Sequence, residues 1–351
     1  MRGNGNGHQV NGTTGMPHVS GPAFSYEGTG SGIIVGDAWH SIQQFSDRTF
    51  RCCVTSPPYW GLRDYGIPGQ IGAEQTLDQY IANLKEVLQK VKRALRDDGT
   101  LWLNIGDSYT SGNRTWRDAD KKNPARGMDY RAPTPEGLKP KDLIGVPWRI
   151  AFALQADGWY LRSDIIWYKP NCQPESVKDR PTRAHEYLFL FSKSEDYFYD
   201  HKAIVETTKS GKGTRNRRTV WSINTEPFAD AHFATFPPSL IEPAILAGTE
   251  PNDIVLDPFF GSGTVGEVCL RLNRRFVGIE LKPEYAEIAA KRLHWKKAES
   301  NGNGCHSNGI PRSETKRPNR LLRTPESSTR ALPLPGFECN APQSLPSAFS
   351  R

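Results

Sequence analysis

The chain has 351 residues and a formal net charge of +7, and its hydrophobic content is only 36%. This length allows one large domain or two small ones, and the low hydrophobic content predicts polar segments outside a packed core. No apolar run approaches the ~18–20 residues of a membrane span, and residues 1–7 lack the apolar centre of a secretory signal. The six cysteines show no C-x-x-C spacing, so we expect free thiols and no metal site.

Strands and helices alternate along the central part of the chain. The predicted strands are 33–37, 50–55, 100–105, 160–168, 186–191, 254–256 and 276–279. The predicted helices are 77–95, 143–156, 237–247, 265–272 and 283–293, and the first has apolar residues at helical i, i+3, i+4 and i+7 spacing. This alternation predicts an α/β fold with a mostly parallel sheet and helices on both faces.

Polar segments flank and interrupt this pattern. Residues 1–25 and 298–351 are rich in Gly, Asn, Ser and Pro, and we expect disordered tails there, with one folded domain over 26–297. Within the domain, residues 202–218 hold six basic residues and one acidic residue, a net charge of +5. Two interpretations of this stretch remain open: a loop that contacts phosphates, or a solvated loop without a ligand.

The run Thr55-Ser56-Pro57-Pro58-Tyr59-Trp60 follows the second predicted strand. Proline fixes φ and removes a backbone N–H, so the two prolines make a stiff corner that presents carbonyl groups. A hydroxyl, a carbonyl and an aromatic ring placed together suit a flat ring that bears an amine. Alone, such a run is usually a simple proline turn. Its position directly after a predicted strand favours a ligand pocket instead.

A glycine-rich loop occurs late in the chain, between a predicted strand and a predicted helix. Gly261, Gly263 and Gly266 satisfy the G-x-G-x-x-G spacing, and Glu280 lies 19 residues beyond Gly261, at the end of the next strand. A carboxylate at that position can accept hydrogen bonds from ribose hydroxyls. The pattern therefore predicts an adenosine-type cofactor.

Two observations argue against a dinucleotide. Asp257 directly precedes the loop, and a carboxylate there would repel a pyrophosphate while attracting an amino or sulfonium cation. The loop also lies near the end of the predicted domain, whereas a dinucleotide-binding fold needs several further strands after it.

Taken together, Thr55–Trp60 and the run Asp257-Pro258-Phe259-Phe260-Gly261-Ser262-Gly263-Thr264 resemble the amino-methylating DNA methyltransferases, which use S-adenosylmethionine (SAM). The catalytic motif comes first and the SAM motif last, as in their circularly permuted β group. The resemblance covers about residues 33–293. It implies a Rossmann-like methyltransferase sheet over 26–297, with inserted target-recognition loops at 171–230 and 108–141.

The resemblance also assigns candidate site residues. The catalytic pocket would be formed by Ser56, Pro57, Pro58 and Tyr59, closed by the strand Asp164–Pro170. The cofactor would be bound by Asp37, Phe236, Asp257, Pro258, Phe259, Gly261, Gly263, Thr264 and Glu280. Of these, Glu280 would bind the ribose and Asp37 would lie near the adenine.

The chemistry of methyl transfer to a base amine suits the motif. The lone pair of an exocyclic amine is delocalised into the ring. If the Ser56 side chain and the Pro57 carbonyl accept hydrogen bonds from the two amine protons, the lone pair becomes localised on nitrogen and can attack the methyl-sulfonium directly. Tyr59 would stack on the base after the base is flipped from the duplex. No Pro-Cys dipeptide of the ring-carbon methyltransferases occurs, and Cys52 and Cys53 are expected in the core.

Ser56 at the first motif position favours cytosine N4 within this family, with adenine N6 as the alternative. Lys212, Arg215, Arg217 and Arg218 are candidate DNA contacts. We expect double-stranded DNA as the partner of a monomer or homodimer in the cytoplasm of a prokaryotic or phage-infected cell. A cognate restriction endonuclease is a candidate second partner, because enzymes of this family often belong to restriction-modification systems.

Three other functions are compatible with parts of the sequence. A NAD-dependent oxidoreductase would use the same glycine spacing, but Asp257 and the late loop weigh against it. A SAM enzyme acting on protein or RNA would share the cofactor motif. A catalytically inactive DNA-binding relative is disfavoured because both motifs are intact.

Overall fold

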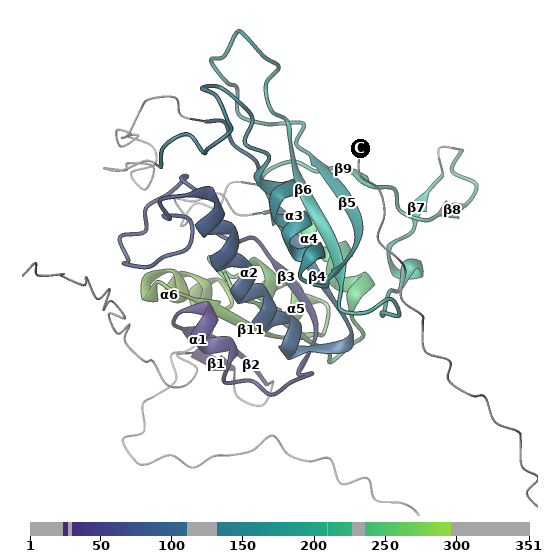
Figure 1. Cartoon of the computed structure of the whole chain (residues 1–351). Helices are drawn as coiled ribbons and strands as arrows, with labels where there is room; N and C mark the ends of the chain where they lie inside the picture. Colours follow the sequence, from purple (N-terminus) through teal and green to yellow (C-terminus); the bar gives the residue numbers. More distant parts are fainter. Residues whose placement is uncertain (1–23, 27–29, 111–131, 209, 227–235, 296–351) are drawn as a thin grey trace, which may run out of the picture. The chain divides into compact units, whose positions relative to one another are not determined.

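The computed structural model describes residues 24–26, 30–110, 132–208, 210–226 and 236–295 (Figure 1). Most of both predicted tails lies outside these residues. Residues 24 and 25, which the sequence assigned to the N-terminal tail, instead form part of strand β1 (Phe24–Tyr26), because they pair antiparallel with β2 (Ser31–Val35). In the part of the chain that is described, no helix is both long and apolar enough to cross a membrane.

The core is a nine-stranded sheet with the order β1-β2-β11-β10-β3-β4-β6-β5-β9. The central strands β2, β11, β10, β3 and β4 run parallel, β6 is antiparallel to β4 and β5, and β9 is parallel to β5. The remaining strand bounds are β3 Phe50–Thr55, β4 Leu95–Ile105, β5 Tyr160–Tyr168, β6 His185–Ser192, β9 Val220–Ser222, β10 Ile254–Asp257 and β11 Arg275–Glu280. The predicted mostly parallel α/β sheet is confirmed.

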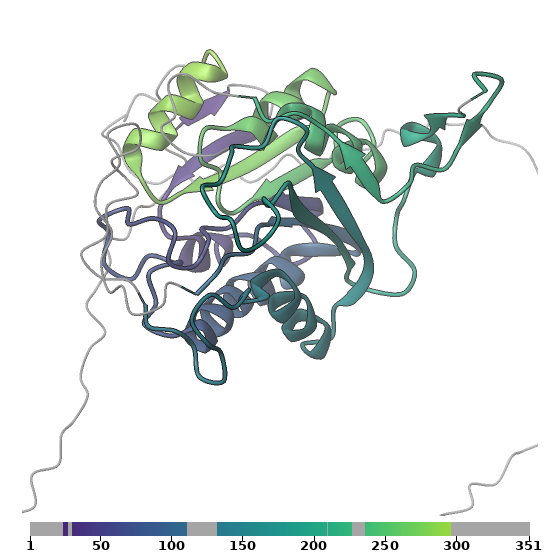
Figure 2. The ribbon, with the colours of Figure 1, turned by 90° about the horizontal axis from the view of Figure 1, so that it is seen from above.

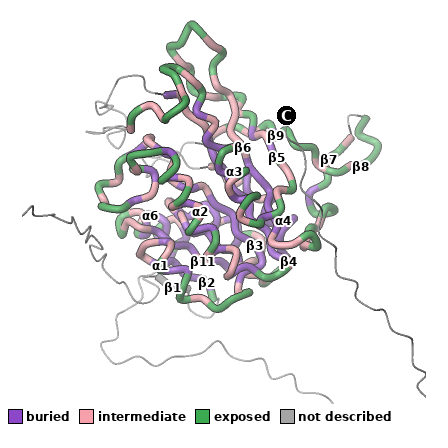
Figure 3. The backbone as a smooth tube through the Cα atoms, viewed as in Figure 1, coloured by how far each residue is buried: buried purple, intermediate pink, exposed green. Residues whose placement is uncertain are grey.

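Helices cover both faces of this sheet, as Figure 2 shows. One layer contains α1 (Ala38–Ile42), α2 (Leu77–Ala94) and α3 (Val146–Ala156), and the other contains α4 (Pro238–Gly248), α5 (Thr264–Arg271) and α6 (Pro283–Arg292). Successive strand residues point to opposite faces: Trp102 packs with the second layer, whereas Leu101 and Leu103 pack with the first. Figure 3 shows that the buried residues, in purple, follow the strands of the sheet between the two helix layers.

Some elements differ from the sequence prediction. The second predicted helix begins at Val146, and strand β4 begins at Leu95, directly after α2 and earlier than expected. Helix α1 was missed because five residues are too few for helical periodicity, although Asp37 caps it by accepting from the His40 N–H. The basic stretch overlaps a 3-10 helix at His201–Ile204 and includes a hairpin of β7 (Glu206–Thr207) and β8 (Thr214–Arg215).

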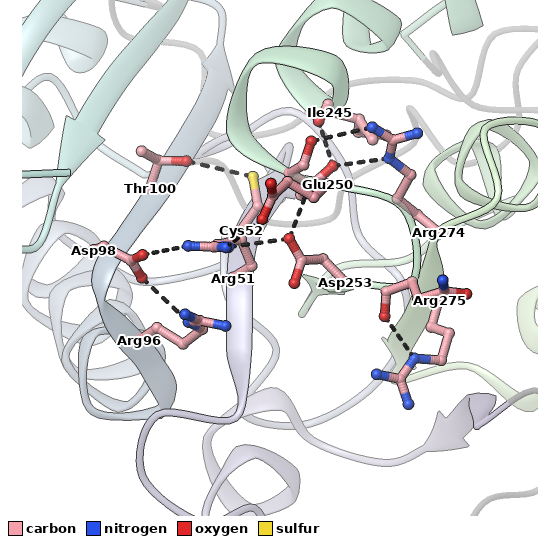
Figure 4. A network of polar contacts seen from close by, with 12 residues as sticks. Arg51, Cys52, Arg96, Asp98, Thr100, Ile245, Glu250, Asp253, Arg274 and Arg275 are labelled. Atoms are coloured by element: carbon pink, nitrogen blue, oxygen red, sulfur yellow. Dashed lines mark hydrogen bonds and ion pairs between the residues drawn. The ribbon is translucent and has the colours of Figure 1, made fainter. Parts of the chain in front are cut away.

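At the amino-terminal edge of the parallel strands, one arginine joins three strands (Figure 4). Arg51 at the start of β3 pairs with Asp98 on β4, with Glu250 at 2.9 Å and with Asp253 at 3.0 Å, just before β10. Its guanidinium also lies 4.5 Å from the ring centroid of Phe198. This cluster fixes the strand ends opposite to the edge at which the two sequence motifs lie.

The cysteines behave as the sequence predicted. All four described cysteines are free, and Cys52, Cys53 and Cys269 are buried. Burial raises the pKa of the Cys53 thiol well above its ordinary value, so this side chain stays protonated and packs as part of the core.

Candidate functional site

A cleft of 1230 Å³ lies at the carboxyl ends of the parallel strands. The segments that leave β3, β4, β10 and β11 line it together with the start of α1 and the segment after β5. Ligands of open α/β sheets bind at this edge. The predicted site residues that line the cleft are Asp37, Ser56, Pro57, Pro58, Tyr59, Phe236, Asp257, Pro258, Phe259, Gly261, Thr264 and Glu280.

The glycine loop links β10 to α5 in a conformation that needs glycine. Gly261 and Gly263 have positive φ values of 54° and 83°. A Cβ on Gly266 would lie 2.8 Å from the Phe276 ring and 2.9 Å from the Phe260 ring. Gly266 therefore allows α5 to pack closely on the sheet, and Gly263 forms the turn rather than the cleft lining.

Asp257 is the buried carboxyl of the loop, with 2% of its surface exposed. Its Oδ1 accepts hydrogen bonds from the Thr55 hydroxyl at 2.6 Å and from the Phe259 N–H at 3.1 Å. Desolvation raises the pKa of Asp257 from 3.8 to about 7, although both hydrogen bonds favour the charged form. A cationic ligand group in the cleft would restore the ionised carboxylate.

Glu280 ends β11 and faces the same loop. Its two carboxylate oxygens accept from the Gly261 N–H at 2.8 Å and from the Lys282 N–H at 2.9 Å. Burial raises the pKa of Glu280 above its ordinary range, while these backbone donors oppose the rise. Each oxygen retains acceptor capacity for a hydroxyl.

Asp37 is already engaged within α1. Its carboxylate accepts from the His40 N–H at 3.0 Å and contacts the His40 Nδ1 at 2.8 Å. It lines the cleft, and its Oδ1 caps the helix.

The S-P-P-Y motif follows β3, the neighbour of the strand β10 that leads into the glycine loop. Tyr80 Oη donates to the Pro58 carbonyl at 2.9 Å, and the Leu62 N–H donates to the Tyr59 carbonyl at 3.2 Å. Among the described residues, no hydrogen bond engages the carbonyl of Pro57. The motif is thus held by its last two carbonyls, and Ser56 and Pro57 retain acceptors beside the cleft.

A polar cluster beside Tyr59 was missed from the sequence. Tyr59 Oη donates to Glu186 Oε2 at 2.8 Å, and Glu186 pairs with Lys169, which lies 4.1 Å from the ring centroid of Trp167. Burial first, and then the Glu186 charge, raise the pKa of Tyr59 well above its ordinary value. The phenol is therefore a neutral donor. The available signal was a charged residue at the start of the otherwise apolar strand H-E-Y-L-F-L-F.

The candidate DNA-binding residues lie away from the cleft lining. Arg215 and Arg218 both pair with Glu206, at 2.7 and 2.6 Å, and Arg217 lies 4.5 Å from the Trp221 ring centroid. The hairpin β7–β8 that carries part of this group extends from the sheet (Figures 1 and 2). Residues 111–131 of the predicted second insertion lie outside the described part of the chain.

The described residues contain no group of three or more His, Cys, Asp or Glu side chains able to hold a metal ion. A Rossmann-like sheet that carries an S-P-P-Y motif and a glycine-rich loop in one cleft is typical of the amino-methyltransferase class.

Comparison with known proteins identifies the family. The chain matches the family model of the N6/N4 DNA methylases over residues 50–291, and it belongs to this family of DNA methyltransferases. SAM is the methyl donor of the family.

Similar type II methyltransferases cover most of the chain. M.XycI of Xanthomonas campestris pv. cyanopsidis is 65% identical over 75% of this chain and 88% of that protein. M.SmaI of Serratia marcescens is 63% identical over 74% of this chain and 90% of that protein.

Solved structures agree in fold. The cytosine-N4-specific PvuII DNA methyltransferase has a TM-score of 0.58 at 23% identity, and the match covers 78% of this chain and 88% of that protein. A DNA modification methylase of Thermus thermophilus, solved with SAM, has a TM-score of 0.52 at 24% identity over 74% and 92% of the two chains.

Proposed function

We propose that this chain transfers the methyl group of SAM to the exocyclic N4 amine of cytosine in duplex DNA. One observation carries the proposal: the S-P-P-Y motif and the glycine loop meet in one cleft. They follow the neighbouring strands β3 and β10, which pair through Cys52 with Val255 and Cys53 with Leu256. The Thr55–Asp257 hydrogen bond of 2.6 Å joins the two motifs.

The acceptor groups at the glycine loop fit SAM. The buried Asp257 carboxyl suits the amino or sulfonium charge, because a cation restores the charge that desolvation opposes. Glu280 can accept from the ribose hydroxyls, since the backbone hydrogen bonds leave acceptor capacity on both oxygens. When bound, SAM supplies an electrophilic methyl group on sulfur.

The S-P-P-Y motif orients the base. Ser56 Oγ and the Pro57 carbonyl accept the two amine protons, so that the nitrogen lone pair points at the methyl group. Tyr59 stacks on the base, and binding recovers the few kcal/mol that flipping costs. Positioning and electrostatics suffice, and no covalent bond to the protein forms.

The preference for cytosine rests on Ser56. In this family a carboxylate or amide at the first motif position accompanies adenine, and Ser56 presents a short neutral hydroxyl instead. The cytosine-N4 specificity named for PvuII methyltransferase supports this choice. Adenine N6 is the second candidate acceptor.

Residues 171–230 are the proposed target-recognition region, with Lys212, Arg215, Arg217 and Arg218 as DNA contacts. The shared carboxylate of Glu206 holds two of these guanidinium groups in place, which limits the entropy lost on binding a phosphate. We further propose a monomeric or homodimeric cytoplasmic enzyme paired with a cognate restriction endonuclease, and the type II methyltransferases of bacteria among the relatives support a role in restriction-modification.

The proposal is tested by transfer of labelled methyl groups from SAM to duplex DNA, RNA and protein in parallel. Only the duplex should be labelled. Ser56→Ala and Tyr59→Ala should each lose transfer yet retain SAM affinity, whereas Glu242→Gln, in an exposed pair with Arg271 on α5, should match the wild type. Labelling of RNA or protein alone would refute the DNA substrate.

A further inference from the structure

We infer that Glu186 is a positioning residue of the base pocket: its carboxylate holds the Tyr59 phenol and the Lys169 ammonium together, and thereby fixes the ring on which the flipped base stacks. The inference rests on the proposed function, because it needs a base in the pocket. All three side chains line the cleft. The inference adds a role for a carboxylate that neither sequence motif contains.

The Glu186 carboxylate uses one oxygen for each partner. Oε2 accepts from Tyr59 Oη at 2.8 Å, and Oε1 pairs with Lys169 Nζ. The Glu186 and Lys169 side chains are mostly buried, with 18% and 16% of their surfaces exposed. Hydrogen bonds to a charged group are about twice as strong as those between neutral groups. The carboxylate is therefore fixed at both oxygens, and it ties the stacking residue to the segment that follows β5.

The sheet brings Glu186 to this position between two other chain segments. On β6, Glu186 pairs with Trp167 of β5, and the other side of β6 pairs with β4. Lys169 follows β5 directly, whereas Tyr59 belongs to the segment that leaves β3. One side chain thus joins two walls of the cleft that come from different strands.

Gly106, directly after β4, allows Tyr59 and Glu186 to meet. A Cβ at position 106 would lie 2.9 Å from Tyr59 Cε2 and 3.1 Å from Glu186 Cγ, so both side chains pack on the glycine backbone. A second acceptor, Asn104 Oδ1, lies 3.4 Å from Tyr59 Oη, which is long for a hydrogen bond between two oxygens. Among the described residues, Glu186 therefore provides the shorter hydrogen bond that orients the phenol.

Trp167 anchors the other end of the cluster. This residue is only 2% exposed, and its Nε1 donates to the Ile223 carbonyl at 2.8 Å. Lys169 Nζ lies 4.1 Å from the centroid of the Trp167 ring, a distance at which a cation is attracted to the ring face. The ammonium is held between this ring and Glu186, so the carboxylate is fixed to the sheet and cannot simply follow movements of Tyr59.

The orientation of the Tyr59 ring matters because the stacked base has to present its amine to the methyl group. A misplacement of about 1 Å can slow a reaction about 10²-fold. Without the Glu186 carboxylate, the phenol keeps only the longer contact with Asn104. Loss of Glu186 should therefore reduce the rate of methyl transfer, while SAM binding at the glycine loop is retained.

The first experiment measures single-turnover methyl transfer to duplex DNA. Glu186→Leu removes both contacts and should slow transfer about 10²-fold, with SAM affinity changed less than about twofold. Glu186→Gln keeps an acceptor for the Tyr59 phenol. It should be at least about fivefold faster than Glu186→Leu, as expected for one retained hydrogen bond.

The double variant Tyr59→Phe/Glu186→Leu tests whether Glu186 acts through Tyr59. Residues that share one hydrogen bond have non-additive effects, so the double variant should be about as slow as Glu186→Leu alone. A spectroscopic measurement complements the rates: 2-aminopurine is placed at the methylated position of the duplex, where stacking on the Tyr59 ring quenches its fluorescence. Glu186→Leu should lengthen the fluorescence lifetime of the flipped base, because the ring is no longer held against it.

Two controls separate positioning from folding. Tyr197→Phe removes a phenol that Arg162 contacts at 3.3 Å outside the cleft lining, and it should leave both the rate and the lifetime unchanged. If Glu186→Leu does not fold, Glu186→Leu combined with Lys169→Met replaces the pair by apolar groups and leaves no unpaired charge. This combination still lacks the acceptor for Tyr59 and should show the same slow transfer.

A wild-type transfer rate in Glu186→Leu, multiplied losses in Tyr59→Phe/Glu186→Leu, or an unchanged 2-aminopurine lifetime would each overturn the inference. Failure of the proposed function is distinguishable, since the wild-type enzyme would then produce no methylated cytosine amine in the same reactions.

Discussion

Asp257→Asn should stabilise the protein without ligand and at the same time weaken SAM binding. The amide keeps an oxygen for the Thr55 and Phe259 donors but carries no charge. In the folded protein burial raises the pKa of Asp257 from 3.8 to about 7. The folded state therefore holds this proton more tightly than the unfolded state does, so stability is lost as pH rises from about 4 to about 7.

The structure gives the size of the effect. A rise of the pKa from 3.8 to about 7 corresponds to a cost of about 4 kcal/mol once the carboxyl is ionised. At pH 5 only about 1–2 kcal/mol of this cost is present. The advantage of the Asn variant should thus grow by about 2–3 kcal/mol between pH 5 and pH 8.5.

Two assays check this prediction: urea unfolding of both proteins at pH 5 and 8.5, and calorimetric titration with SAM. For the wild type, SAM affinity should fall about tenfold between pH 8 and pH 6, because binding of a cation needs the ionised carboxylate. The affinity of the Asn variant should be low at both values. A stability difference that does not change with pH, or equal SAM affinities of the two proteins, would refute the reasoning.

Three further substitutions test other parts of the account. Glu280→Ala should weaken SAM binding about 10-fold or more through the lost ribose hydrogen bonds, and unchanged affinity in a calorimetric titration would exclude that role. Gly106→Ala should slow methyl transfer more than it weakens SAM binding, because the new Cβ would displace the Tyr59 ring, 2.9 Å away; equal losses would argue for general misfolding. Arg51→Met should lower the free energy of unfolding by about 3 kcal/mol, since three carboxylates lose their common cation, and a urea midpoint like that of the wild type would contradict this.

The sequence predicted the sheet and the central helices well because those elements are long or strongly periodic. Helix α2 has a buried apolar stripe and a Thr76 cap, and β10 is a short apolar run before the glycine loop. Helix α1 and the hairpin β7–β8 were missed because each has too few residues for a period to emerge.

The site was predictable only where its residues are contiguous. The S-P-P-Y corner and the glycine loop are each recognisable from a short run of residues, and the sheet order then places them on adjacent strands. Lys169 lies in the predicted closing segment Asp164–Pro170, but Glu186 was not predicted. Its contacts with Tyr59 and Lys169 depend on the antiparallel pairing of β6 with β4 and β5. Such long-range pairing leaves no local pattern in the sequence.

The identity of the methylated atom tests the central claim most directly. Duplex DNA should be incubated with the enzyme and SAM carrying a deuterated methyl group, digested to nucleosides, and analysed by mass spectrometry against standards. We expect deuteromethyl label on the N4 amine of deoxycytidine, and loss of this label with Ser56→Ala. Label on adenine N6 would contradict the cytosine assignment, and label on the cytosine ring carbon, or none at all, would contradict the amine mechanism itself.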